Sequence, residues 1–194
     1  MVCRAELDKS YARIELQDVP EITMARSKLA SEVLRITSPD VYDIMMWIDH
    51  DILFTTDDVK SLVHALRNSD YDMLGVVYSM RGPAAGLIGR PVIGPQMVDY
   101  YRESIVDADI LGMGFTAVKR YVFDGLIKAG MEQVDCDIFN DYNPVYPFFS
   151  NLMFGPVVGS GLIAPNGKPI LKKWLQEDCS FCRRVQAAGF KIGI

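Results

Sequence analysis

The sequence predicts a single α/β domain whose mainly parallel central sheet carries helices on both faces. Apolar runs typical of buried strands alternate along the chain with segments in which apolar residues recur at helical spacing. The chain has 194 residues, 49% of them hydrophobic, and no linker rich in Gly, Ser or Pro divides it. Residues 1–194 are therefore expected to form one domain.

The first predicted helix runs from Glu21 to about Ile36, where apolar residues recur every three or four positions. Ser38-Pro39 ends this pattern, because the residue before a proline disfavours helical backbone. The following run IMMWI, residues 44–48, is short and wholly apolar. We expect it to be a buried strand.

A second helix is predicted after this strand, with Thr55, Thr56 or Asp57 as its N-cap. Its inward face is expected to be Val59, Leu62, Val63 and Leu66. The apolar run MLGVVY at 73–78 predicts the next strand. The stretch at 81–95, rich in Gly and Pro, predicts a surface loop.

The second half of the chain continues the alternation. Residues 114–118, GFTAV, predict a strand that leads into a helix from Tyr121 to Ala129 with Val122 and Leu126 on its inward face. Residues 135–169 are expected to be irregular. The chain is expected to end with a helix from about Trp174 to Ala188 and a short strand in GFKIGI.

The composition limits the possible partners. The net charge is −5 and 23% of residues are charged, which gives no general attraction for nucleic acid or an anionic membrane. No apolar run approaches the ~18 residues needed to span a bilayer, and the first residues are too charged for a signal peptide. We expect a soluble cytoplasmic protein.

Cys179 and Cys182 form a CxxC pair, but no second close pair of cysteine or histidine accompanies it. The surrounding sequence predicts a helix that uses Cys182 as a small core residue, rather than a zinc or redox site. Four aromatic residues either pack in the core or stack on a sugar: Tyr142, Tyr146, Phe148 and Phe149.

Two carboxylates, Asp49 and Asp51, follow the predicted strand at 44–48. In extended backbone their side chains would point the same way, with His50 on the opposite face. At ~4 Å and an effective dielectric near 20 their repulsion is about 4 kcal/mol, which favours a cation between them. Hard oxygen ligands suit Mg²⁺ or Mn²⁺. The alternative is a pair of turn aspartates that cap the following helix.

Four segments, in order along the chain, resemble the nucleotide-sugar-dependent glycosyltransferases of the GT-A fold with a DxD metal motif. They are Ala25-Arg26-Ser27, with Ser where the family usually has Asn; Ile44 to Asp51; Gly112-Met113-Gly114-Phe115; and Glu177, Asp178, Phe181, Cys182 and Arg184. The resemblance covers roughly residues 22 to 194. It implies a Rossmann-like GT-A domain.

The resemblance also implies a function: metal-dependent transfer of a sugar from a UDP- or GDP-sugar to a hydroxyl of a glycan or glycoprotein acceptor. Asp51 and Asp49 would bind Mn²⁺ or Mg²⁺, with Asp49 also reaching the ribose, the sugar or a metal-bound water. Arg26 would reach the donor phosphates. Asp178, with Glu177 as its neighbour, would accept the proton of the acceptor hydroxyl.

Each of these residues also has a purely structural interpretation. Arg26 would be a solvated residue on an amphipathic helix, and the two acidic residues at 177 and 178 would favour a helix dipole. Gly112 and Gly114 either leave room for donor or acceptor or permit a tight turn. The sequence ends without the histidine that holds the metal in many relatives, so weak metal binding without nucleotide is expected.

Three other classes of protein stay open. A haloacid-dehalogenase-like phosphatase also places a DxD after a buried strand, but it would have Thr or Val where this chain has Leu53. A nucleotidyltransferase would want a Gly-rich basic loop near the N-terminus, and none is visible. A non-catalytic carbohydrate-binding domain would bind without turnover. Release of free nucleoside diphosphate from a nucleotide sugar would distinguish a transferase from all three.

Overall fold

The computed structural model describes residues 21–36, 38, 42–79, 87–88, 90–91, 105–135, 144–154 and 173–194. The N-terminal 20 residues, most of the loop predicted at 81–95, most of the irregular region predicted at 135–169, and Tyr142 lie outside this part of the chain. Among the described residues, no helix is both long and apolar enough to cross a membrane.

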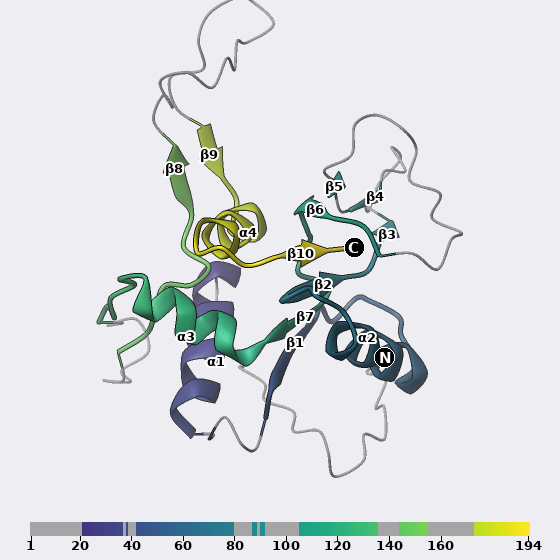
Figure 1. Ribbon diagram of the computed structural model, residues 1–194. Helices are drawn as coiled ribbons and strands as arrows, with labels where there is room; N and C mark the ends of the chain where they lie inside the picture. The colour runs from purple at the N-terminus through teal and green to yellow at the C-terminus, as the bar shows by residue number, and fades with distance from the viewer. Residues whose placement is uncertain are drawn as a thin grey trace, which may run out of the picture.

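The described residues form four helices and ten strands (Figure 1). In chain order they are α1 (Ile22–Ile36), β1 (Ile44–Ile48), α2 (Thr56–Arg67), β2 (Met73–Gly75), β3 (Tyr78–Ser79), β4 (Leu87–Ile88), β5 (Arg90–Pro91), β6 (Ala108–Ile110), β7 (Phe115–Lys119), α3 (Arg120–Lys128), β8 (Leu152–Phe154), β9 (Lys173–Leu175), α4 (Glu177–Ala187) and β10 (Ile192–Gly193).

The largest sheet has four strands in the order β1-β7-β2-β10, and it is mixed. Strand β7 runs antiparallel to both of its neighbours, and only β2 and β10 pair in parallel. The prediction of a mainly parallel, Rossmann-like GT-A sheet is therefore wrong. Only residues 111–114 separate β6 from β7, so no helix lies directly before β7, and β7 pairs antiparallel with both β1 and β2. The architecture is a mixed α/β one.

Alternating residues of β1 face two different hydrophobic cores, as the period of a strand requires. Met45 and Trp47 face the larger core, which includes residues of α1, α3 and α4. Ile44, Met46 and Ile48 pack against the smaller core, to which α2 contributes Leu62 and Leu66. Helix α2 thus lies on one side of the sheet, and the other three helices lie on the opposite side (Figure 1).

Helix α2 follows its sequence signals. Thr55 is the N-cap, and its side chain accepts from the backbone N–H of Asp58 while the Asp58 carboxylate accepts from the N–H of Thr55. This capping box satisfies N–H groups that the first turn would otherwise leave unpaired. The predicted inward face is buried, and it consists of Val59, Leu62, Val63 and Leu66. Both predictions for this helix are confirmed.

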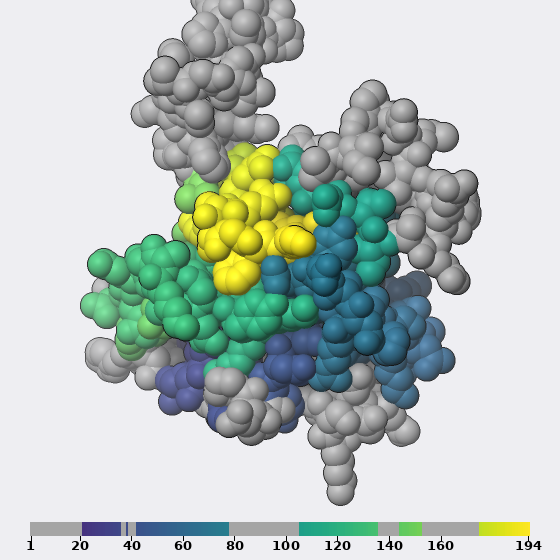
Figure 2. Space-filling model, in the orientation of Figure 1, coloured from purple at the N-terminus to yellow at the C-terminus, as the bar shows by residue number. Residues whose placement is uncertain are grey.

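Two other predicted boundaries need correction. Trp174 lies in β9, which pairs with β8, so the last helix begins at Glu177. The strand predicted at 73–78 ends at Gly75, and β3 starts at Tyr78. The last predicted strand is confirmed as β10. In the space-filling view, α4 and β10 lie between α3 and β2, with which they are in contact (Figure 2).

Candidate active site

The most deeply buried residues of α1 are mostly polar. Thr23, Arg26, Ser27 and Ala30, which follow one another at helical spacing, are buried. Ile22, one of the apolar residues at helical spacing, is 46% exposed. The Arg26 residue is only 4% exposed, so the interpretation of Arg26 as a solvated surface residue is wrong. A buried arginine has to be paired with acidic groups.

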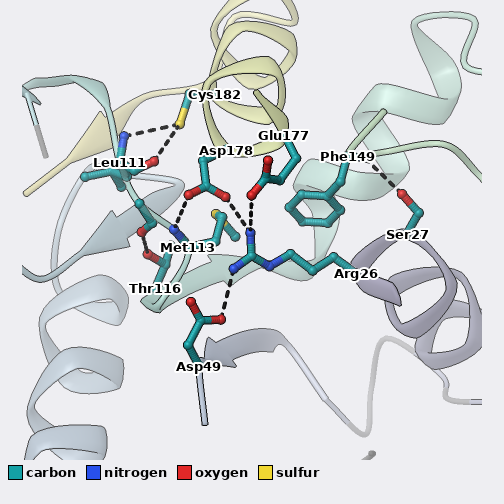
Figure 3. A network of polar contacts seen from close by, with 11 residues as sticks. Arg26, Ser27, Asp49, Leu111, Met113, Thr116, Phe149, Glu177, Asp178 and Cys182 are labelled. Carbon is teal, nitrogen blue, oxygen red and sulfur yellow. Dashed lines mark hydrogen bonds and ion pairs between the residues drawn. The ribbon is translucent and has the colours of Figure 1, made fainter. Parts of the chain in front are cut away.

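Arg26 pairs with carboxylates from two distant segments (Figure 3). Its Nη2 donates to Oδ1 of Asp49 at 2.9 Å, just after β1. Its Nη1 donates to Oδ1 of Asp178 at 2.5 Å and to Oε1 of Glu177 at 3.4 Å, both in the first turn of α4. Arg26 and Asp178 are 152 positions apart in the chain. The guanidinium therefore joins α1, the end of β1 and the start of α4.

Asp178 has a second partner, because its Oδ2 accepts from the backbone N–H of Met113 at 3.2 Å. Burial is the main cause that raises the pKa of Asp178 to about 6. The charge of Arg26 and the Met113 hydrogen bond act in the opposite direction, whereas Glu177 and Asp49 raise the pKa further. The carboxyl is thus largely ionised at neutral pH and protonated in mild acid.

The two aspartates of the DxD motif lie on a turn rather than on extended backbone. Strand β1 ends at Ile48, and the N–H of Ile52 donates to the carbonyl of Asp49 at 3.0 Å. The assumption that strand alternation aims Asp49 and Asp51 in one direction therefore does not hold. The Asp49 side chain is 36% exposed, and Asp51 and His50 are exposed.

The two glycines before β7 take part in the site through their backbone. Gly114 accepts a hydrogen bond from the N–H of Asp49 at 2.8 Å, and Gly112 accepts one from the Thr116 hydroxyl at 2.7 Å. Both glycines are buried. The turn they occupy holds Asp49 on one side and presents the Met113 N–H to Asp178 on the other.

Two serines of α1, to which the sequence analysis gave no role, form hydrogen bonds beside the site. The Ser27 hydroxyl accepts from the N–H of Phe149 at 3.1 Å, and the Ser31 hydroxyl accepts from the N–H of Tyr146 at 2.9 Å. The spacing of the two serines at i and i+4 was a signal that they share one face of α1. Ser27, which stands where the resembled family has Asn, thus ties α1 to the segment 146–149.

Helix α4 also forms hydrogen bonds to this segment, at residues 150–152. Ser180 accepts from the N–H of Leu152 at 2.9 Å, and Arg184 donates to the carbonyl of Ser150 at 2.7 Å. These bonds lie on the helix that carries Glu177 and Asp178. Both α1 and α4 therefore form hydrogen bonds to the segment 146–152, which connects the two helices.

The other sequence candidates belong to the core. Cys182 is fully buried, its Sγ accepts from the N–H of Leu111 at 3.3 Å, and burial raises the pKa of the thiol to about 12. It is a core residue, as predicted. Phe148 and Phe149 are fully buried in an aromatic cluster with Phe123 and Phe181, so they pack in the core.

The carboxylates of Asp49 and Asp51 are of the kind that hard divalent cations prefer. Asp49 and Asp51 offer carboxylate oxygens that solvent can reach. Among the residues that the structure describes, no group of three or more His, Cys, Asp or Glu side chains is arranged to hold a metal. An ion at this place would therefore take much of its coordination from water and from ligand oxygens, as Mg²⁺ commonly does.

No protein-family model and no curated protein matches this chain. Among solved structures, it is similar to A197 from STIV, with 14% sequence identity and a TM-score of 0.48. The alignment covers 92% of this chain and 65% of that one, so this chain spans 65% of the length of A197. The similarity is too distant to carry an argument about what this chain does.

Proposed function

We propose that this protein is a metal-dependent glycosyltransferase that moves a sugar from a nucleoside-diphosphate sugar to a hydroxyl group. One observation carries the proposal. The four separate segments that resemble such enzymes meet at one place, where Arg26 binds Asp49 and Asp178, and Met113 binds Asp178. A site that binds a donor and an acceptor together requires such a convergence of separate segments.

The charges of the site favour a donor that arrives with a cation. In the part of the chain that the structure describes, Arg26 pairs with three carboxylates, those of Asp49, Glu177 and Asp178, and Asp51 lies on the same turn as Asp49. This excess of negative charge repels a bare diphosphate. A divalent ion held by Asp49 and Asp51 would offset it, and when bound it would neutralise the leaving diphosphate as a Lewis acid.

Asp178 is suited to the role of general base. Its pKa of about 6 leaves it ionised at neutral pH but still basic enough to accept a proton. Its bonds to Arg26 and Met113 fix the orientation of the carboxylate, and each carboxylate oxygen has a further lone pair for the acceptor hydroxyl. The donor in this proposal is a UDP- or GDP-sugar and the acceptor a glycan or glycoprotein.

The test is metal-dependent binding and turnover of nucleotide sugars. The full chain would be titrated with a panel of UDP- and GDP-sugars in Mn²⁺ or in chelator, and release of free nucleoside diphosphate would be measured. Asp51→Asn should abolish the metal-dependent part of donor binding, because it removes one of two proposed metal ligands. The fold should be retained, since Asp51 is exposed.

Asp57→Asn is the matched control. Asp57 is exposed, lies six positions later in the first turn of α2, and takes no part in the capping box of Asp58. The same loss of charge there should leave donor binding within about twofold of wild type, as expected for an exposed charge in salt. Donor affinity that does not change with Mn²⁺, chelator or Asp51→Asn would refute the proposal.

A further inference from the structure

Strand β1 forms one edge of the largest sheet. Among the described strands it has β7 as its one neighbour, in the order β1-β7-β2-β10. Edge strands are commonly protected by charged residues, proline or a β-bulge, but the sequence IMMWI is wholly apolar and its pairing with β7 is regular. Within the described part of the chain, this edge of the sheet is therefore open to a further strand.

The hydrogen bonds at the two ends of β1 identify the groups that point toward β7. The carbonyl of Asp43 accepts from the N–H of Arg120 at 2.7 Å, and the N–H of Asp49 donates to the carbonyl of Gly114 at 2.8 Å. Hydrogen-bonded positions alternate along an antiparallel pair. The odd-numbered residues of β1 therefore direct their N–H and C=O groups toward β7.

The even-numbered residues, Ile44, Met46 and Ile48, direct their N–H and C=O groups away from β7. The opposite strand agrees with this assignment. The Lys119 N–H and the Phe115 carbonyl, which lie opposite Ile44 and Ile48, bond to the residues that flank β2 rather than to β1. Among the described residues, no backbone group pairs with the outward row of β1.

We infer that an extended polypeptide pairs with this edge of β1 as an added strand, and that this polypeptide carries the acceptor hydroxyl. The pairing uses the outward row of donors and acceptors, which an extended backbone matches without regard to its side chains. That the polypeptide is the acceptor rests on the proposed function. The acceptor in that role is a protein segment rather than a free glycan.

The open edge leads directly to the candidate active site. Asp49 follows the last residue of β1, and Arg26 joins it to Asp178, the proposed base (Figure 3). A peptide paired with residues 44–48 would bring its next residues beside these side chains. A serine or threonine at that point of the peptide would offer its hydroxyl to the site.

The charges at this end of β1 specify the peptide further. Three carboxylates, those of Asp49, Glu177 and Asp178, surround the guanidinium of Arg26. A lysine or arginine close to the acceptor hydroxyl is therefore favoured, whereas an acidic residue there is repelled. Along β1 itself, β-branched residues of the peptide suit an added strand.

A second copy of this chain is a poorer partner for the edge. The outward residues are symmetric about Met46, so two copies of β1 would pair antiparallel about that residue. This register sets Asp43 of one copy opposite Asp49 of the other. Like charges directly opposite each other destabilise a sheet.

Amide hydrogen exchange, measured by NMR on the full chain, tests whether the edge is open. In the protein alone, the amides of Ile44, Met46 and Ile48 should exchange at least about tenfold faster than those of Met45 and Trp47, which bond to β7. Equal protection of all five amides would show that the edge is already covered and would overturn the inference. Light scattering would then show whether a second copy covers it.

The binding probe is a blocked peptide of alternating threonine and valine with lysine at each end. At saturation it should slow the exchange of the three outward amides at least about tenfold and leave Met45 and Trp47 unchanged. Glutamate in place of lysine should weaken binding. The same peptide with every amide N-methylated cannot donate hydrogen bonds and should give no protection. Protection that is equal with the N-methylated peptide would overturn the inference.

Met46→Pro removes one outward donor and no bond to β7, and proline is tolerated on an edge strand. It should weaken peptide affinity about three- to tenfold, whereas the matched variant Met46→Ala, which keeps the N–H, should stay within about twofold of wild type. Equal affinities in two folded variants would contradict the pairing. If circular dichroism shows that Met46→Pro does not fold, the comparison with the N-methylated peptide decides.

These measurements contain no nucleotide sugar, so the two proposals fail separately. Peptide pairing at β1 in a protein that releases no nucleoside diphosphate from any donor would retain the added strand and refute the transferase. Transfer of a sugar to a peptide that leaves the outward amides unprotected would retain the transferase and overturn the inference. Donor turnover with no transfer to the bound peptide would overturn the assignment of the acceptor.

Discussion

Asp178 lies next to an arginine and nevertheless has a raised pKa, because the burial of its carboxyl outweighs the charge of Arg26. The negative charges of Glu177 and Asp49 raise the pKa further. Sequence patterns do not report the balance of these effects, since it depends on how far the carboxyl is removed from water. The acidic pair at the start of a helix was visible in the sequence, but its pairing with Arg26 was not.

The raised pKa of Asp178 predicts that the free energy of unfolding decreases as the pH rises. In the folded protein the carboxyl keeps its proton up to about pH 6, whereas in the unfolded chain it releases it near 3.8. The stability from this group is therefore full below about pH 4 and lost as the pH rises through 6. Relative to Asp178→Asn, the wild-type free energy of unfolding should fall by up to about 3 kcal/mol between pH 4 and 6.5.

Urea unfolding of both proteins across this pH range measures the difference. Glu177→Gln, which removes the neighbouring charge and keeps Asp178, is the control and should retain a clear decline with pH. A wild-type stability that rises relative to Asp178→Asn over the same interval would mean that the pairing with Arg26 outweighs burial.

The proposed base makes a second prediction at the same residue. Asp178→Asn should lower kcat for transfer by a factor of about 10²–10⁴, because the acceptor hydroxyl loses its proton acceptor. Donor binding should change little, since the donor side of the site is Asp49 and Asp51. The pH dependence of wild-type transfer should show an acid limb near 6, where Asp178 becomes protonated.

Glu177→Gln is the matched comparison for this rate measurement. A larger loss of kcat in Glu177→Gln than in Asp178→Asn would move the base by one residue. Small and equal losses in both variants would leave the acidic pair with structural roles, pairing with Arg26 and favouring the helix dipole.

At the scale of elements, α1 shows where periodicity misleads. The apolar spacing of residues 22–36 identified a helix with bounds close to those of α1, but not the face it buries. Arg26 and Ser27 are on the buried side because each has a partner there, a set of carboxylates for Arg26 and the Phe149 N–H for Ser27. A single sequence does not distinguish a buried polar residue with its hydrogen bonds satisfied from a polar residue that is exposed to solvent.

Ser27→Ala tests the attachment of α1 to the segment 146–149. The substitution leaves the buried N–H of Phe149 without its acceptor, so the free energy of unfolding should fall by about 1–3 kcal/mol. Ser61→Ala, at an exposed position of α2, should change it by less than about 0.5 kcal/mol. Chemical denaturation measures both, and equal effects would show that the Ser27 bond contributes nothing.

Helix positions were predicted better than strand relations. The bounds of α2, its cap and its inward face follow from local signals within a dozen residues. The direction of β7 does not, because an apolar run has the same period whichever way it runs in the sheet. The turn at Asp49–Ile52 was missed for a related reason: the motif continues an apolar strand pattern although the backbone has already left it.

At the scale of the whole molecule, the sheet is shared by two cores. Trp47, on one face of the sheet, is buried in the larger core, and Phe115, on the other face, is buried in the smaller one. The strands that carry them, β1 and β7, pair with each other. The Arg26 network lies where α1, β1, α4 and the turn before β7 meet. Its geometry therefore depends on the packing of the whole domain rather than on one loop.

The prediction of a single domain can be tested with one leucine from each core. Leu66, in the smaller core, and Leu126, in the larger, are 0% and 4% exposed. Leu66→Ala and Leu126→Ala should each lower the stability by about 2–5 kcal/mol. In each variant, tryptophan fluorescence and far-UV circular dichroism should report one coincident transition. Two separate transitions, each shifted by one variant only, would show two independent units.

Leu53→Ala is the control for both core variants. Leu53 is 88% exposed, so its truncation removes little buried surface. The expected change in stability is less than about 0.5 kcal/mol.

The antiparallel strand β7 has a consequence for how the protein is made. Strands β1 and β2 come early in the chain, but each pairs with β7, which is synthesised only after all the residues up to 114. A nascent chain on the ribosome thus carries two unpaired apolar strands until their common partner emerges, and β10 joins β2 only at the last residues of this sequence. Such high contact order is associated with slow folding. Unpaired strand edges of this kind favour aggregation until the pairing is complete.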